Sequence, residues 1–184
     1  VEKKARGQAD FIEYFGKQAA KRHKNDSKSI GVNWDRAHDL LKIFTKDKPL
    51  PFAQIDMHLI ESFRDFLLKA PRGGNKSGTI SQNTASTYFT LFKAALHQAF
   101  IDSYFDVDIA AKVKGISGVE SRREYLTIEE LNKLAATPCE YPMLKKAAFF
   151  SALTGLRHSD IRKMTWKELS VEGDHYRINF TQRK

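Results

Sequence analysis

Apolar residues spaced three and four positions apart dominate the first two thirds of the chain, and this helical periodicity constrains the fold more than any other feature. The longest run covers residues 81–101, where the apolar side chains fall on one face. Similar runs begin near residues 9, 34 and 57, and proline or glycine interrupts the chain between them. Such spacing is typical of amphipathic helices that pack together. The pattern predicts a mainly α fold with an N-terminal helical bundle.

Shorter signals mark the remaining elements. The polar segment 24–31 ends in glycine and predicts a loop between the first two helices. Thr127 and Glu130 have the spacing of a capping box and predict the start of a helix. A helix is predicted over 157–166, and the alternating segment 175–181 predicts a strand that follows a turn.

A change in composition suggests two domains. Residues 114–124 contain two glycines, two serines and mixed charges, which is typical of a linker. We therefore expect a helical domain over residues 1–115 and a linker over 116–124. Residues 125–184 are expected to begin an α+β domain that includes the start of a small β-hairpin.

The charge balance favours an anionic partner. The 184 residues include 31 Lys and Arg against 22 Asp and Glu, for a net charge of +9. The single cysteine, Cys139, excludes an internal disulfide and a cysteine-rich zinc site. No apolar stretch reaches the roughly 18 residues of a membrane span, and the charged start resembles no signal peptide. We expect a cytoplasmic protein with no membrane partner, no metal and no cofactor.

The most informative stretch, 154–166, reads Thr-Gly-Leu-Arg-His-Ser-Asp-Ile-Arg-Lys-Met-Thr-Trp. Glycine ends one helix, Arg157 follows, and Asp160 lies on the same face of the next helix. A guanidinium held at such a junction is suited to bidentate contact with a phosphate, and the new helix's N-terminus adds positive charge. The residues alone leave open that Arg157 only pairs with Asp160 and stabilises the junction.

This stretch resembles the first signature box of the tyrosine recombinase (phage integrase) family, T-G-L-R-x-S-[DE]-[IL]-x-x-L-x-W, with Met164 at the usual leucine. Residues 124–131 resemble the entry into that family's catalytic domain. Residues 81–96 resemble the last long helix of its SAM-like core-binding domain. The similarity is greatest to integrases of conjugative transposons and prophages, which are mobile elements. It implies a core-binding domain followed by the N-terminal part of a catalytic domain.

The resemblance implies site-specific recombination of double-stranded DNA through a 3′-phosphotyrosyl intermediate. In the family, two arginines and a histidine stabilise the pentavalent phosphate, and a hairpin lysine protonates the leaving oxygen. By match to the motif, Arg157 is the first of these arginines and Asp160 supports it. Lys184 occupies the position of the hairpin lysine. Neither a metal nor another cofactor is needed, because the covalent link conserves the broken bond.

The sequence also departs from the family pattern. No histidine is followed by an arginine three residues later, and no tyrosine lies beyond such an H-x-x-R box. We therefore interpret the chain as a fragment that does not itself cleave DNA. The full-length parent is expected to act as a homotetramer on paired recombination sites, and the fragment to be monomeric.

The resemblance places the polar faces of the second and fourth helices against DNA, and the helix residues named as candidates lie on the polar face of the fourth. Polar residues of that face and basic residues of a loop and the linker are the candidate DNA contacts: Asn83, Thr87, Lys93, His97, Lys76, Arg122 and Arg123. A lysine would contact phosphate, and an asparagine is suited to reading adenine. The residues alone also allow a solvated helix face. Two other hypotheses stay open: a non-catalytic helical DNA-binding regulator with the same fold, and a helical protein-interaction domain.

Overall fold

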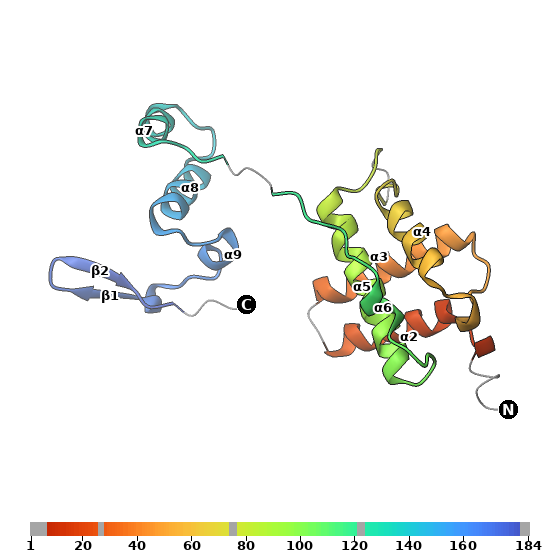
Figure 1. Ribbon diagram of the computed structural model, residues 1–184. Coiled ribbons are helices and arrows are strands. Elements are labelled where there is room, and N and C mark those ends of the chain that lie inside the picture. Colours follow the sequence, from red (N-terminus) through yellow and green to blue (C-terminus); the bar gives the residue numbers. More distant parts are fainter. Residues whose placement is uncertain (1–6, 26–27, 74–76, 121–123, 181–184) are drawn as a thin grey trace. The chain divides into compact units, whose positions relative to one another are not determined.

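Helices make up most of the computed structural model, which describes residues 7–25, 28–73, 77–120 and 124–180. The predicted mainly α fold is confirmed. The chain divides into two units, residues 1–122 and 123–184 (Figure 1). The first unit therefore continues past residue 115, where the sequence predicts the helical domain to end.

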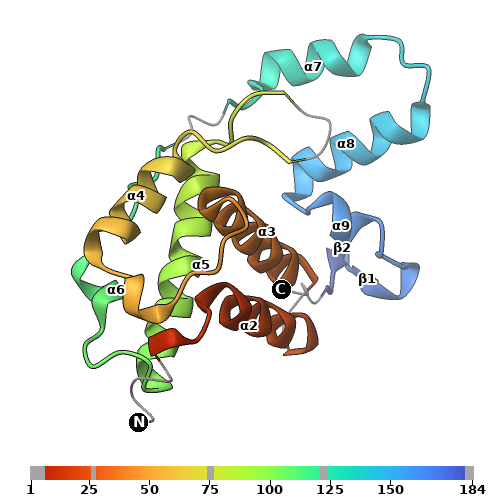
Figure 2. The same cartoon turned by 90° about the vertical axis from the view of Figure 1, so that its right-hand side faces the viewer.

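The first unit consists of helices that surround one long helix. Its elements are α2 (Phe11–Asn25), α3 (Lys28–Thr45), the 3-10 turn η1 (Phe52–Gln54), α4 (Met57–Leu67), α5 (Gln82–Ile101) and α6 (Ile109–Lys112). Helix α5 packs against α3, α4 and α6, while α2 packs against α3 (Figure 2). Side chains cap the helix starts: Asp56 accepts a hydrogen bond from the Leu59 amide, and Ser81 accepts one from the Thr84 amide.

Aromatic rings form the centre of the first unit. Phe92 of α5 is fully buried, and its ring centroid lies 4.6 Å from that of Phe63 on α4. The centroids of Phe11 and Phe15 on α2 lie 5.8 and 6.4 Å from that of Phe92. Ring contacts at these distances add to the free energy of burying the apolar area. The first unit thus has a hydrophobic core of its own, which is the basis of an independently folding domain.

The loop predicted over 24–31 is wrong for most of its length. Helix α2 continues to Asn25 and α3 begins at Lys28, so Gly31 lies inside a helix. A Cβ atom at Gly31 would lie 2.5 Å from Nδ1 of His23 on α2. The glycine therefore allows the two helices to approach closely, and it indicates tight helix packing rather than a loop.

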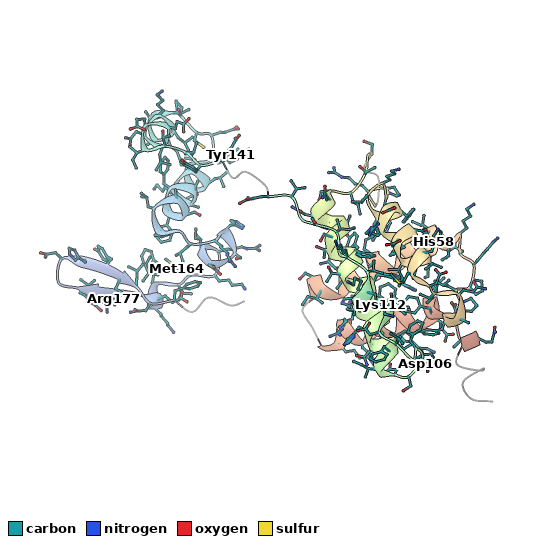
Figure 3. The ribbon with its side chains drawn as sticks, viewed as in Figure 1. His58, Asp106, Lys112, Tyr141, Met164 and Arg177 are labelled. Carbon is teal, nitrogen blue, oxygen red and sulfur yellow. The ribbon has the colours of Figure 1, made fainter. Side chains whose placement is uncertain are left out.

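The second unit is helical at its start and ends in a hairpin. Its elements are α7 (Ile128–Ala136), α8 (Pro142–Thr154), α9 (His158–Ile161), η2 (Trp166–Glu168), β1 (Leu169–Glu172) and β2 (His175–Ile178). The capping box of Thr127 and Glu130 is confirmed, and the predicted strand is β2, which pairs antiparallel with β1. Within residues 124–180 no large apolar side chain is buried, and Trp166 is 88% exposed. Figure 3 labels Tyr141, which is 63% exposed, in this unit.

The helix predicted over 157–166 is wrong in its length. Helix α9 covers only one turn, because Thr165 adopts an extended backbone and starts η2 with a second capping box. The Thr165 amide donates to a carboxylate oxygen of Glu168 over 2.7 Å. The Thr-x-x-Glu spacing of this box is present in the sequence. The capping box starts a new element at Thr165, and α9 therefore ends early.

Candidate nucleic-acid interface

The polar face of α5 is occupied by a segment of the same chain. Residues 113–119, which we call the α5 strap, follow α6 and run back along α5 toward its N-terminal end (Figure 1). Val113 is 3% exposed, and Ile116 packs partly against the core. The linker predicted over 116–124 therefore differs from the structure in its first part, because residues 116–119 are bonded to α5.

Side chains of α5 form hydrogen bonds with the backbone of the α5 strap along its length. Asn83 makes two bonds: its Nδ2 donates to the Val119 carbonyl over 2.9 Å, and its Oδ1 accepts from the Val119 amide over 2.8 Å. Three further side chains donate to strap carbonyls: Gln82 to Ser117 over 2.8 Å, Ser86 to Ile116 over 2.7 Å, and Lys93 to Val113 over 2.6 Å. Asn83 thus pairs with Val119 by one donor and one acceptor, as a strand residue would, whereas Gln82, Ser86 and Lys93 only donate.

A charged contact lies just before the strap, at the start of α6. Nδ1 of His97 lies 2.7 Å from Oδ2 of Asp108, the residue that caps α6. Burial of Asp108 opposes ionisation, but the hydrogen bonds from His97 and from the amides of Ala111 and Ala110 outweigh it. They hold the pKa of this carboxyl below its ordinary value. Asp108 is therefore a carboxylate at neutral pH, and it attracts the His97 ring to the base of the strap.

The predicted DNA contacts on α5 are spread along one face of the helix from Asn83 to His97, and each of them bonds to the chain itself. Asn83 and Lys93 hold the strap, His97 contacts Asp108, and the Thr87 hydroxyl donates to the Asn83 carbonyl of its own helix. Their contact with DNA stays a prediction. Lys76, Arg122, Arg123 and Lys184 lie outside the described residues.

The sequence reasoning missed Gln82 and Ser86 as parts of this face. Both lie one helical turn apart on the side that also presents Lys93 and His97, so a polar stripe at helical spacing was present in the sequence. The stripe indicates a polar partner, but it does not say whether that partner is water, nucleic acid or the chain itself.

Removing the Asn83 side chain should release the end of the α5 strap. In Asn83→Ala, we expect hydrogen exchange at the Val119 amide to accelerate by about tenfold, because this amide loses its acceptor. Hydrogen exchange read by mass spectrometry or NMR measures the change. Thr87→Ala is the matched control, because Thr87 bonds only within α5. Equal exchange at Val119 in both variants would contradict the assigned role of Asn83.

Arg157 stands where α8 ends and α9 begins. Gly155 closes α8 with a left-handed backbone of φ 69°, and the Ser151 hydroxyl fixes the next residue by donating to the Leu156 carbonyl over 2.7 Å. Arg157 is exposed, and Asp160, three residues later, is buried at 8% exposure. Among the described residues the two side chains form no ion pair. The Arg157 guanidinium therefore keeps its donors available to an oxyanion.

Tyr14 is a buried tyrosine whose hydroxyl is hydrogen-bonded to a carboxylate. Its hydroxyl donates to Oδ2 of Asp102 over 2.6 Å, and the side chain is 9% exposed. Burial, and then the bond to the Asp102 carboxylate, raise the pKa of Tyr14 well above its ordinary value. The Tyr14 hydroxyl therefore stays protonated and links α2 to Asp102 at the end of α5.

The described residues contain neither a cluster suited to a metal nor a helix suited to crossing a membrane. No cluster of three or more His, Cys, Asp or Glu side chains has the arrangement of a metal site there. No helix in the described ranges combines the length and apolar character needed to cross a membrane.

The architecture and the basic charge define the class of the first unit: a small helical domain suited to an anionic polymer. The family model of the phage integrase SAM-like domain matches residues 10–114, which is more than half of the chain. The chain therefore belongs to the phage integrase SAM-like domain family, and residues 10–114 are an integrase-related DNA-binding region. Neither the curated proteins nor the solved structures gave a match.

Proposed function

We propose that this chain is the DNA-binding part of a site-specific tyrosine recombinase: the core-binding domain together with the beginning of the catalytic domain. The family match over residues 10–114 is the observation that carries this proposal. Residues 154–166, which have the spacing of the first arginine box, support it independently from the second unit.

In this proposal Arg157 binds the scissile phosphate in the full-length enzyme. Its exposure, and its lack of a carboxylate partner among the described residues, support that role. Buried Asp160 is proposed as a positioning residue for the turn, and its backbone amide donates to the Arg157 carbonyl over 2.9 Å. Lys184 is proposed as the general acid. The nucleophilic tyrosine and the H-x-x-R box are not in this chain, so cleavage needs a longer protein.

Binding of a DNA duplex tests the proposal directly. We expect the chain to bind a fluorescently labelled duplex with an affinity that falls steeply as salt rises, because each neutralised phosphate contributes about −0.9 to the slope of log K against log salt. Fluorescence anisotropy over about 50–200 mM NaCl gives the affinity and the slope.

An unfolded chain with the same charge is the necessary control. Phe92→Ala removes a buried core ring and leaves the net charge of +9 unchanged. If binding depends on the folded surface, this variant binds more weakly than the wild-type chain at a urea concentration at which only the variant is unfolded. Absence of duplex binding by the wild-type chain would contradict the proposal and favour a protein-interaction domain. Equal duplex affinity of the folded and unfolded chains would show that the binding is non-specific charge attraction.

A further inference from the structure

A short ladder closes the loop between α4 and α5. Pro71 and Thr79 form an antiparallel bridge, the Arg72 amide donates to the Gly78 carbonyl over 3.0 Å, and the Ile80 amide donates to the Ala70 carbonyl over 3.0 Å. The ladder leads directly into Ser81, the cap of α5. The base of the loop is therefore fixed relative to the N-terminal end of the longest helix.

Two arginines are attached to opposite sides of this ladder. Nη2 of Arg36, which comes from α3, donates to the Pro71 carbonyl over 3.2 Å. Nε of Arg72 donates to the Thr79 carbonyl over 3.1 Å. Pro71 and Thr79 are bridge partners, so one ladder anchors two guanidiniums, one at each edge, from positions far apart in the sequence. We call Arg36 and Arg72 the arginine pair.

The arginine pair is not neutralised within the described residues. Neither guanidinium there forms an ion pair with a carboxylate, whereas Arg64 pairs with Asp65 and Arg22 lies over the ring of Trp34. Each guanidinium has five N–H donors and uses one of them on the ladder. The remaining donors are available to an external acceptor, and the nearby N-terminus of α5 adds partial positive charge.

We propose that the arginine pair is a clamp for the phosphodiester backbone of a DNA duplex. Guanidinium groups match the geometry of phosphate oxygens, and attachment to the ladder lowers the entropy lost when they bind. The arginine pair contacts the DNA backbone rather than the bases. It therefore adds affinity and fixes where the domain lies on the duplex, without a preference for DNA sequence. This inference rests on the proposed function, and it moves the predicted contact from the strap-covered face of α5 to the loop base.

Gly73 offers a way to displace one guanidinium without changing any charge. A Cβ atom at this position would lie 2.9 Å from Cζ and 3.0 Å from Nη2 of Arg36. The clash is with the end of a flexible side chain, so Gly73→Ala should move Arg36 and leave the helices intact. The double variant Arg36→Gln and Arg72→Gln removes both charges.

The test measures duplex binding by fluorescence anisotropy as a function of salt, with two duplexes of unrelated sequence. We expect the double variant to bind both duplexes about tenfold more weakly, with a salt slope that is smaller by about one to two. Gly73→Ala should weaken binding several-fold at unchanged net charge. The matched control is Lys46→Gln with Lys48→Gln, which removes two charges from the exposed turn after α3. Circular dichroism checks that all variants remain helical.

Three outcomes would overturn the inference while leaving the proposed function intact. In the first, the double variant binds no more weakly than the lysine control. In the second, Gly73→Ala binds as the wild type does. In the third, calorimetric titration with inorganic phosphate shows binding that the double variant loses, although duplex affinity is unchanged. That result would assign the pair to free phosphate. Failure of the wild-type chain to bind any duplex would instead refute the proposed function.

Discussion

Phe92→Ala is expected to lower the free energy of unfolding of the first unit by about 3–5 kcal/mol, the range for truncating a buried aromatic side chain. Phe92 is fully buried, and its ring contacts rings from α2 and α4 as well as from its own helix. Small domains are stable by only about 5–15 kcal/mol, so the loss is a large share of the total. The expected result is a first unit that unfolds at much lower urea concentration.

The fluorescence of the two tryptophans makes this measurement specific to the first unit. Trp34 is 4% exposed inside that unit, whereas Trp166 of the second unit is 88% exposed already. The change in emission during a urea titration therefore comes mostly from Trp34. Ile101→Ala, on the same helix but 57% exposed, is the control and should change stability by no more than about 0.5 kcal/mol. Similar losses in both variants would show that the ring cluster is not the centre of the core.

The helices of the first unit were predictable because their stability comes from an apolar face, which sequence periodicity records directly. The predictions were wrong where close helix packing or a capping box, rather than an apolar face, determines the local structure. Gly31 was read as a loop residue, but it fits the close approach of α3 to His23. Thr165 interrupts a predicted helix because its capping box with Glu168 competes with further helical turns.

The α5 strap was not predictable because its bonds use backbone carbonyls, which every residue carries. Gly118 and its neighbours have the composition of a flexible linker, and the missing side chain also permits approach to Asn83: a Cβ there would lie 3.3 Å from the amide oxygen. Polar side chains such as Lys93 were recognised as a partner-binding face, but the partner observed is the chain itself.

The arginine pair escaped sequence reasoning for a related reason. Arg36 lies on a helix and Arg72 in a loop, 36 positions later, and only the ladder between Pro71 and Thr79 gives both of them a common anchor. The junction around Arg157 could be predicted because its signal is local: a helix end, a left-handed glycine and a helix start within five residues. Local constellations can be read from sequence, whereas sites assembled by tertiary contacts need the fold.

Arg157→Ala should abolish most DNA cleavage in the full-length recombinase proposed above. If Arg157 binds the scissile phosphate, its removal leaves the charge that develops in the transition state without a main donor. Losses of about 10²–10³-fold in rate accompany removal of one such donor. Cleavage of a duplex that carries the recombination site, followed as covalent protein–DNA product, measures the rate.

Binding must be measured beside cleavage, because a loss of affinity alone would imitate a loss of chemistry. Arg157 is one exposed cation in a chain with a net charge of +9, so duplex affinity should change only slightly in Arg157→Ala. Arg162→Ala, an exposed arginine at the end of α9, removes the same charge and should retain cleavage. Wild-type cleavage by Arg157→Ala would show that the arginine only stabilises the α8–α9 junction, and equal losses in both variants would assign the effect to DNA binding. Selective loss at Arg157 distinguishes a group that acts on the phosphate from one that merely helps to hold the duplex.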